Sequence, residues 1–239
     1  MTKTTINKEE LKKFEAMAEE WWDPTGKFKP LHQFNPVRLN FIISQLQTHY
    51  NLKELDLSKV NILDVGCGGG LVAEPLDNLK AKVTAIDASE ININIAKTHQ
   101  KTSGSKVDYQ TSTIEDLKSS TKFDVITCLE VVEHVDNLEF LLSNLKKNVK
   151  KNGLIFIATI NRTVKSMLLA KFAAEYILGW LPRGTHDFKK FLKPSELNNL
   201  IGKEVNLLMQ TGFKYNILTN SWNLTNDLAQ NYMMVFEKK

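Results

Sequence analysis

The chain has 239 residues, of which 42% are hydrophobic and 24% charged, and its formal net charge is +4. This length suits one α/β domain rather than two, and the composition excludes a globally disordered chain. The mild positive charge does not by itself indicate nucleic-acid binding, and we expect none. Because no secretory signal and no apolar run of about 18 residues is visible, we expect a cytoplasmic protein.

The first part of the chain predicts helices. Apolar residues recur at three- and four-residue steps between residues 8 and 21, as in an amphipathic helix. A break follows around Pro24 and Gly26. Residues 28–43 are apolar again, and Arg38 is predicted in the first turns of a second helix. We expect residues 1–55 to form an N-terminal helical cap.

The middle of the chain alternates apolar strands with helical patterns. Strands are predicted at residues 60–65, 81–86, 107–110, 123–129 and 153–160. Ser89 is placed to cap the helix that follows the second strand. Strands separated by crossover helices form a parallel sheet with helices on both faces. Residues 56–160 are therefore predicted to form an α/β core.

The end of the chain predicts a different connection. An apolar and basic insertion occupies residues 161–193, and Pro194 opens a further helix. Two strands are predicted at residues 212–218 and 231–236. Only a polar loop joins them, as is usual for antiparallel neighbours. Residues 194–239 thus predict a C-terminal helix and an antiparallel strand pair, which gives a mostly parallel, seven-stranded sheet.

A glycine-rich loop follows the first core strand, in the sequence ILDVGCGGG at residues 62–70. The dinucleotide fingerprint requires glycine or alanine where this chain has Leu71, and the lysine of a P-loop is absent. Asp64 would repel a pyrophosphate but suits an amino group. Asp87, at the end of the second strand, can accept hydrogen bonds from both hydroxyls of a ribose. S-adenosylmethionine combines a ribose with an ammonium group and has no phosphate, so it fits these residues.

A second polar group follows the fourth strand, in the sequence TCLEVVEHV. Leu129 is expected beside the cofactor, because ligands of open α/β sheets bind at the carboxyl ends of strands. If a helical turn starts there, Glu130, Glu133 and His134 share one face and can hold a divalent cation such as Mg²⁺. Glu133 and His134 are also candidates for the base that removes a hydroxyl proton. A solvated helix start is the alternative interpretation.

The insertion carries two further signals. His186, in the sequence RGTHDFKKF, is a candidate base from the opposite wall of the site, and a basic surface loop is the alternative. Residues 165–184 predict a helix that is apolar over most of its circumference and flanked by basic residues. This pattern is typical of a helix lying in an anionic membrane interface, and an apolar cap over the active site would explain it equally well.

The glycine loop followed by Asp87 resembles the class I methyltransferases, whose sheet has seven strands with the last one antiparallel. A closer resemblance, over about residues 10 to 236, is to the ubiquinone-biosynthesis O-methyltransferase family. It is carried by the sequences FEAMAEEWWDPTGKFKPLHQFNPVRLNFI, TCLEVVEHV, NRTVKS and AEYILGWLPRGTHDFKKF. The resemblance implies methyl transfer from S-adenosylmethionine to a polyprenyl catechol and later to demethylubiquinol.

The resemblance also implies site residues. By position it places cofactor contacts at Arg38, Gly66, Asp87 and Leu129, to which the glycine loop adds Asp64 and Gly68. Arg38 can pair its guanidinium with the methionine carboxylate. In relatives, the set Glu130, Glu133 and His134 is associated with a divalent ion.

Substrate and partners follow from the same resemblance. A long isoprenoid tail would explain the apolar insertion through peripheral contact with the inner face of the plasma membrane, and a complex of ubiquinone-biosynthesis enzymes is a further expected partner. Three alternatives remain open: an O-methyltransferase of another small phenolic acceptor, a cofactor-binding regulatory protein without turnover, and a nucleotide-dependent dehydrogenase. Leu71 and Asp64 count against the dehydrogenase.

Overall fold

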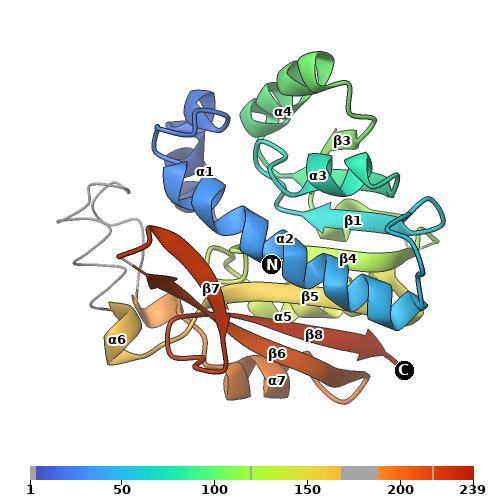
Figure 1. Cartoon of the computed structure of the whole chain (residues 1–239), viewed down its shortest axis with the longest axis vertical. Helices are drawn as coiled ribbons and strands as arrows, with labels where there is room; N and C mark the ends of the chain where they lie inside the picture. The colour runs from blue at the N-terminus through green and yellow to red at the C-terminus, as the bar shows by residue number, and fades with distance from the viewer. Residues whose placement is uncertain (1–3, 119, 168–187, 217) are drawn as a thin grey trace.

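The computed structural model describes residues 4–118, 120–167, 188–216 and 218–239, which form a sheet of eight strands in the order β3-β2-β1-β4-β5-β8-β6-β7 (Figure 1). The strands are β1 Asn61–Val65, β2 Lys82–Asp87, β3 Asp108–Thr111, β4 Phe123–Leu129, β5 Val149–Ile160, β6 Val205–Asn216, β7 Ser221–Thr225 and β8 Asn231–Lys238. The first five are parallel, whereas β8 pairs antiparallel with both β5 and β6.

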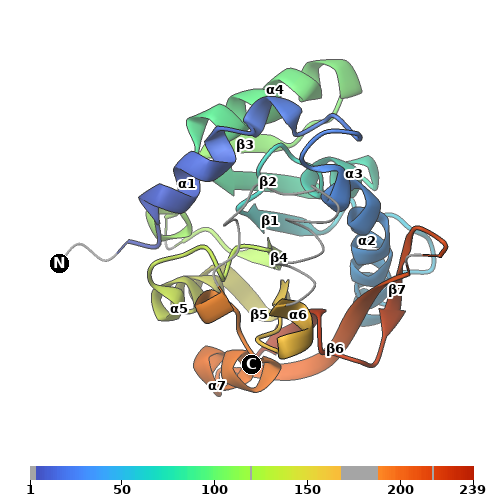
Figure 2. The same ribbon diagram turned by 90° about the vertical axis from the view of Figure 1, so that its left-hand side faces the viewer.

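Helices cover both faces of the sheet (Figure 2). They are α1 Lys8–Glu15, α2 Lys29–Tyr50, α3 Ala73–Asn78, α4 Glu90–Ser103, α5 Leu138–Asn148, α6 Val164–Met167 and α7 Pro194–Ile201, with 3-10 turns η1 Ala18–Glu20, η2 Ile114–Asp116 and η4 Phe188–Lys190. None of the described helices is long and apolar enough to cross a membrane.

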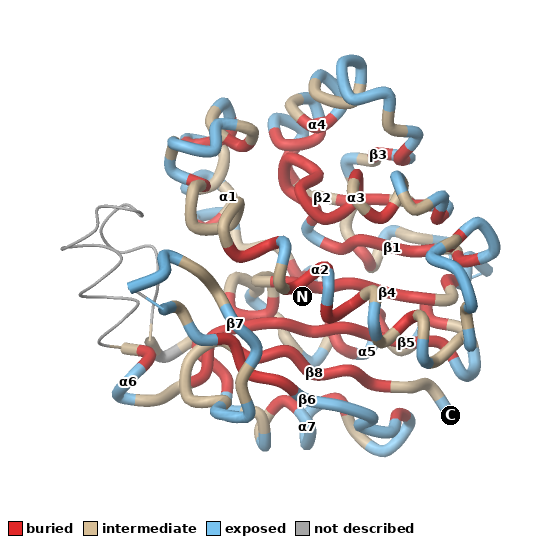
Figure 3. The backbone as a smooth tube through the Cα atoms, in the orientation of Figure 1, coloured by how far each residue is buried: buried red, intermediate tan, exposed pale blue. Residues whose placement is uncertain are grey.

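The core consists of two apolar clusters, one on each face of the sheet. Helices α2, α3 and α4 contribute to the first cluster, and α5 and α7 contribute to the second. The neighbours Ile62 and Leu63 of β1 are fully buried in different clusters, because successive side chains of a strand point to opposite faces. The central strands are accordingly buried along most of their length (Figure 3), as predicted for a parallel sheet between helices.

The predicted count of seven strands is wrong by one. Strand β7 lies in the stretch predicted as a polar loop and pairs antiparallel with the end of β6. A turn over residues 218–220 joins them, with Asn220 in the left-handed region at φ 48°, a conformation that asparagine tolerates. Trp222 of β7 stacks on Phe34 of α2, with 4.4 Å between the ring centroids. This tertiary contact stabilises a strand that the local sequence does not predict.

The N-terminal segment, defined here as residues 4–22, lies at the carboxyl ends of the parallel strands (Figure 2). The helix predicted over residues 8–21 is shorter in the structure, because α1 ends at Glu15 and η1 follows over Ala18–Glu20. After η1, Trp21 packs with Phe28 and Leu71 in a small apolar cluster. The prediction that Ser89 caps the helix after the second strand is confirmed. The Ser89 hydroxyl accepts a hydrogen bond from the Asn92 backbone N–H at 3.2 Å, at the start of α4.

Candidate active site

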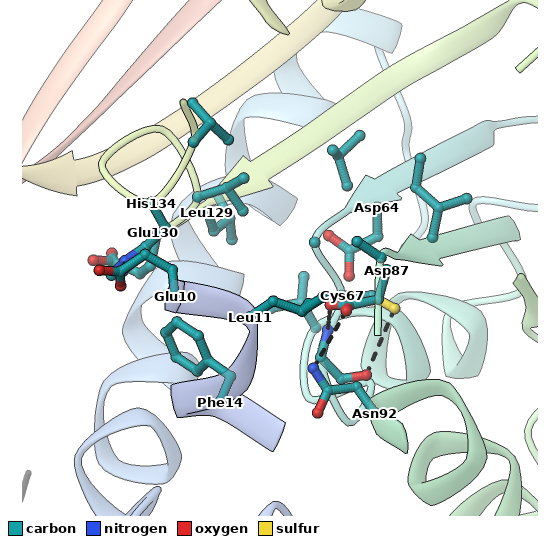
Figure 4. A pocket seen from close by; sticks show the side chains of 18 of the residues that line it. Glu10, Leu11, Phe14, Asp64, Cys67, Asp87, Asn92, Leu129, Glu130 and His134 are labelled. Atoms are coloured by element: carbon teal, nitrogen blue, oxygen red, sulfur yellow. Dashed lines mark hydrogen bonds and ion pairs between the residues drawn. The ribbon is translucent and has the colours of Figure 1, made fainter. Parts of the chain in front are cut away.

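A cavity of about 280 Å³ opens at the carboxyl ends of β1, β2 and β4, under the N-terminal segment (Figure 4). The predicted site residues that line it are Arg38, Asp64, Gly66, Gly68, Asp87, Leu129, Glu130, Glu133 and His134. The structure therefore brings the residues predicted for cofactor and acceptor together in one space. His186, the remaining predicted residue, lies outside the described residues.

Asp87 fastens the glycine loop to the end of β2. One of its carboxylate oxygens accepts a hydrogen bond from the Gly68 N–H at 2.9 Å, and the other accepts from the Ser89 N–H at 2.8 Å. Burial raises the pKa of Asp87, against the lowering effect of these N–H donors. The carboxylate thus lies at the wall of the cavity in a fixed orientation (Figure 4), as a contact to ribose hydroxyls requires.

Two of the loop glycines make room for a tryptophan. A Cβ atom on Gly69 would lie 2.6 Å from the Cβ and Cγ atoms of Trp21, and one on Gly68 would meet the ring of the same residue. The Trp21 indole donates to the Asn92 side chain at 3.0 Å, and the Trp22 indole donates to the Gly69 carbonyl at 2.9 Å. The glycines therefore serve the docking of the N-terminal segment as well as the approach of a ligand.

Asp64 is buried near the end of β1, and only one of its two carboxylate oxygens accepts a hydrogen bond from a described residue. One oxygen accepts a hydrogen bond from the Thr127 hydroxyl at 2.6 Å, and the other has no hydrogen-bond partner among the described residues. Burial raises the pKa of Asp64 to about 7, although Thr127 and the charge of Arg38 lower it. A cationic ligand group beside this carboxylate would stabilise its ionised form.

Arg38 lies in the middle of α2, not in its first turns, and its guanidinium faces the cavity. Its Nη1 donates to Glu130 at 3.2 Å, and its Nη2 donates to the Asn35 side chain. The guanidinium carbon lies 4.5 Å from the centroid of the Phe34 ring, a cation–π distance. The side chain is 3% exposed, so a carboxylate ligand would meet a preoriented guanidinium that it must share with Glu130.

The loop after β4 differs from its prediction. Glu130 has a positive φ of 57°, residues 132–134 form a turn, and α5 begins only at Leu138. A left-handed residue cannot start a right-handed helix, so Glu130, Glu133 and His134 do not share a helix face. Glu130 pairs with Arg38, and His134 pairs with Glu10 of α1.

The predicted Mg²⁺ site is therefore not formed. The described ranges contain no group of three His, Cys, Asp or Glu side chains that could hold a metal ion. Leu129, by contrast, lies where it was predicted, at the end of β4 in the cavity wall and 8% exposed.

Glu133 is a buried carboxylate in the cavity wall. It is 3% exposed, and neither of its oxygens has a hydrogen-bond partner among the described residues. Burial raises the pKa of the neighbouring Glu130 to about 7, and the charge of Glu133 and the hydrogen bond that protonated Glu130 can donate to it contribute to this rise. Burying a carboxylate without a partner costs folding free energy, and such exceptions call for a functional explanation. Glu133 is thus placed to accept a hydrogen bond from a ligand.

His134 is held from the N-terminal segment. Its Nδ1 lies 2.9 Å from a carboxylate oxygen of Glu10, and its ring meets the Phe14 ring edge-to-face at a centroid distance of 5.0 Å. Glu10 was not predicted as a site residue, because glutamates of an amphipathic helix are usually exposed. The contact joins residues 124 positions apart. Its only local signal is that Glu10 and Phe14 share one helix face.

Comparisons with known proteins identify the fold and the family of this chain. The model of the methyltransferase domain family matches residues 43–209. The plantazolicin methyltransferase BpumL in complex with SAH has a TM-score of 0.65 at 17% identity, over 97% of this chain and 98% of that chain. The magnesium protoporphyrin IX methyltransferase of Synechocystis PCC 6803 with bound SAH has a TM-score of 0.60 at 17% identity, over 87% and 83%. The fold and the family match define a class I S-adenosylmethionine-dependent methyltransferase.

Relatives with higher sequence identity match this chain over nearly its whole length and nearly their own. The ubiquinone biosynthesis O-methyltransferase of Pelagibacter ubique is 50% identical over 98% of this chain and 99% of its own. The proteins of the same name from Rickettsia felis and Sinorhizobium medicae are each 46% identical over 99% of this chain, and over 96% and 97% of their own. The chain belongs to the family of ubiquinone biosynthesis O-methyltransferases, which confirms the family predicted from the sequence.

The raised pKa of Asp64 predicts that cofactor affinity depends on pH. If the ammonium group of S-adenosylmethionine binds there, the ionised carboxylate is required, and its population rises as pH increases through the pKa of about 7. We expect calorimetry to give about eightfold tighter binding at pH 7.5 than at pH 6, the ratio of the ionised fractions of Asp64 at these two pH values. In Asp64→Asn this difference should disappear. Equal affinities of the unmodified protein at the two pH values would contradict the contact.

Proposed function

We propose that this protein transfers the methyl group of S-adenosylmethionine to a phenolic hydroxyl of a polyprenyl catechol, and to demethylubiquinol, in ubiquinone biosynthesis. The names of its full-length relatives support the pathway. In this reaction the bond between the methyl carbon and the sulfonium sulfur breaks as a bond to the hydroxyl oxygen forms. The hydroxyl proton must pass to a base, because a neutral phenol, with a pKa of about 10, is a weak nucleophile.

The donor side of the proposal uses the wall formed by α2, β1 and β2. Arg38 pairs with the methionine carboxylate, Asp64 with the ammonium group, and Asp87 with the ribose hydroxyls. Gly66, Gly68 and Leu129 surround the ligand between these contacts. All six residues line one cavity, so a single extended ligand can reach them together.

On the acceptor side, the proposed function depends on Glu133. A buried carboxylate without a partner among the described residues, in the same cavity as the glycine loop, is the observation on which the proposal depends. Glu133 accepts a hydrogen bond from the reacting ring and orients its hydroxyl toward the methyl group. The neighbouring His134 takes the proton in its neutral form. Burial lowers the pKa of this imidazole, but the hydrogen bond with Glu10 and the charges of the nearby carboxylates raise it above its ordinary value. The divalent cation is not part of this mechanism, because the described side chains do not fit it.

A labelled-methyl assay tests the reaction and the substrate class together. The protein is incubated with methyl-labelled S-adenosylmethionine and a catechol carrying a short isoprenoid tail, with and without a chelator. We expect label in the methoxyphenol, in larger yield than with the same ring lacking the tail. Equal turnover of the tail-less ring would favour the alternative, a methyltransferase of small phenols. Loss of label in the chelator arm would restore the cation to the mechanism.

Peripheral membrane contact through residues 161–193 is a further part of the proposal, and it is supported by composition. The stretch is rich in apolar side chains and contains Arg162, Lys165, Arg183, Lys189, Lys190 and Lys193. Of its described cations, Arg162 pairs with Glu196 and Lys165 pairs with Asp227. An association with other enzymes of the pathway has no such support among the described residues.

We expect flotation with liposomes to recover the protein on anionic vesicles, because basic residues flanking an apolar stretch are attracted to anionic lipid. Recovery should fall at high salt, since salt screens this attraction. Neutral vesicles serve as the control. A protein that stays in the bottom fraction under every condition would contradict membrane contact and leave the methyl-transfer proposal untouched.

A further inference from the structure

Asn92, in the first turn of α4, is a buried polar side chain that joins two parts of the cavity wall. It is 3% exposed and lines the cavity. Its Oδ1 accepts a hydrogen bond from the Trp21 indole at 3.0 Å, and its Nδ2 donates to Oδ1 of Asp87 at 3.3 Å. Figure 4 shows Asn92 beside Asp87. The amide thus lies between the N-terminal segment and the carboxylate that is proposed to bind the ribose.

These two neighbours allow only one orientation of the Asn92 amide. An indole N–H can only donate a hydrogen bond, and an ionised carboxylate can only accept one. If the amide were turned over, its nitrogen would face the indole N–H and its oxygen would face the Asp87 carboxylate. Both hydrogen bonds would then be lost, and two repulsive contacts would replace them in a buried place. Trp21 therefore determines that Asn92 presents its donor to Asp87.

The indole that orients Asn92 has little room to move. Trp21 is 7% exposed, and its ring stacks on Phe28 with 3.8 Å between the centroids. On Gly68, a Cβ atom would meet the same ring, so the ring also lies against the glycine loop. A side chain packed in this way holds its hydrogen-bond partner in a fixed place.

The backbone of Asn92 is fixed as well. Its N–H donates to the hydroxyl of Ser89, the N-cap of α4, at 3.2 Å. The same hydroxyl donates to the Glu15 carboxylate of α1 at 2.9 Å. The N-terminal segment thus contacts the start of α4 at two places, at the cap through Glu15 and at the Asn92 amide through Trp21.

The hydrogen bond from Asn92 also affects the charge of Asp87. Burial raises the pKa of Asp87, and two backbone N–H donors and the Asn92 amide lower it. An ionised carboxylate accepts hydrogen bonds from hydroxyl groups more strongly than a neutral one does. Because the other two donors belong to the backbone, the contribution of Asn92 is the one that a substitution can remove.

We propose that Asn92 is a positioning residue of the donor site, which holds the Asp87 carboxylate for the ribose hydroxyls in an orientation set by Trp21. The inference rests on the contact between Asp87 and the ribose in the proposed function. Because Trp21 belongs to the N-terminal segment, docking of that segment and binding of the cofactor favour each other.

A ligand that lacks the ribose hydroxyls tests the assignment. Calorimetry measures the affinity for S-adenosylhomocysteine, which has the same ribose as the methyl donor, and for its 2′,3′-dideoxy analogue. We expect Asn92→Ala to weaken binding of S-adenosylhomocysteine by about tenfold, the cost of losing one hydrogen bond to a charged group. The affinity for the analogue should change by less than about twofold, because the missing hydroxyls are the groups through which Asn92 acts.

The role of Trp21 is tested by the ratio of the two affinities. Trp21→Phe keeps an aromatic ring against Phe28 but removes the indole N–H, so it should reduce the preference for the ligand that carries the hydroxyls. In the Asn92→Ala background the same change should leave this preference unaltered, because effects that pass through one residue are not additive.

Two further variants separate positioning from packing. Asn92→Asp keeps the shape of the side chain and the acceptor for Trp21, but it sets a second carboxylate against Asp87. It should bind S-adenosylhomocysteine no better than Asn92→Ala does, because like charges at this distance repel. Asn94→Ala changes an exposed asparagine of the same helix and should retain both affinities.

The possible failures are distinguishable. Equal losses for both ligands in Asn92→Ala, or unimpaired binding by Asn92→Asp, would overturn the inference in favour of a packing role. A Trp21→Phe protein that keeps the full preference would overturn the orientation by Trp21. Unchanged binding by Asn92→Ala would overturn the inference alone if Asp87→Ala loses the preference for the ribose hydroxyls. If Asp87→Ala keeps that preference, the donor side of the proposed function fails, and the inference fails with it.

Discussion

Replacing Glu133 with glutamine is expected to lower kcat/KM for the phenolic acceptor by about 10²-fold, the cost of misplacing a reacting group by about 1 Å. The change keeps the volume of the side chain but replaces the carboxylate with an amide, which is a weaker acceptor for the hydroxyl that Glu133 would orient. Affinity for S-adenosylmethionine should remain within about twofold, because the proposed donor contacts lie on other elements. Initial rates of methyl transfer and calorimetry with the cofactor measure the two effects separately.

The stability of Glu133→Gln is a second measurement, and it should not fall together with the activity. The Glu133 carboxylate is buried without a hydrogen-bond partner among the described residues, so neutralising it should leave the free energy of unfolding unchanged or raise it. Glu139→Gln, at an exposed position in the first turn of α5, is the matched control and should keep both properties. A Glu133→Gln protein that retains full activity, or loses activity only because it unfolds, would contradict the catalytic assignment.

Replacing Asp87 with alanine is expected to weaken S-adenosylmethionine binding by at least about 100-fold. Two charge-assisted hydrogen bonds to ribose hydroxyls would be lost, each contributing about 1.5–3 kcal/mol. The Gly68 and Ser89 N–H groups would also lose the acceptor that holds the loop. Titration calorimetry measures the affinity, and thermal unfolding shows whether the protein remains folded.

The matched control for Asp87→Ala is Asp108→Ala. Asp108 is exposed at the start of β3 and does not line the cavity, so its loss should leave cofactor affinity unchanged. If Asp87→Ala bound the cofactor as tightly as the unmodified protein does, the donor side of the proposed function would have to be placed elsewhere.

The residues on the donor side of the cavity could be predicted from the sequence, because they lie at the ends of recognisable strands and in a glycine-rich loop. Asp64 and Asp87 mark the ends of two apolar strands, and parallel strands deliver their carboxyl ends to the same edge of the sheet. The register of the β1–β2 pair then brings the two acids close, because Val65, which follows Asp64, lies opposite Ile86, which precedes Asp87. The role of Asp87 in holding the glycine loop could not be read from spacing, because it depends on the folded loop.

The acceptor side was predicted less well, because it depends on contacts between distant residues. Glu130, Glu133 and His134 would share a helix face only if a right-handed helix began at Glu130. The positive φ of Glu130 excludes such a helix. Glu10 was not predicted because its partner His134 lies on another element, and its position on the same helix face as Phe14 does not by itself indicate that contact. Strand β7 was missed for the same reason, as its Trp222 is held by Phe34 of α2.

If one cavity brings donor and acceptor together, a crystal structure with S-adenosylhomocysteine and a short-tailed catechol should show both ligands inside it. We predict the ribose at Asp87 and a ring hydroxyl within about 2.6–3.2 Å of Glu133, close enough for a hydrogen bond. A catechol bound outside this cavity, or a Glu133 carboxylate turned away from the ring, would contradict the account.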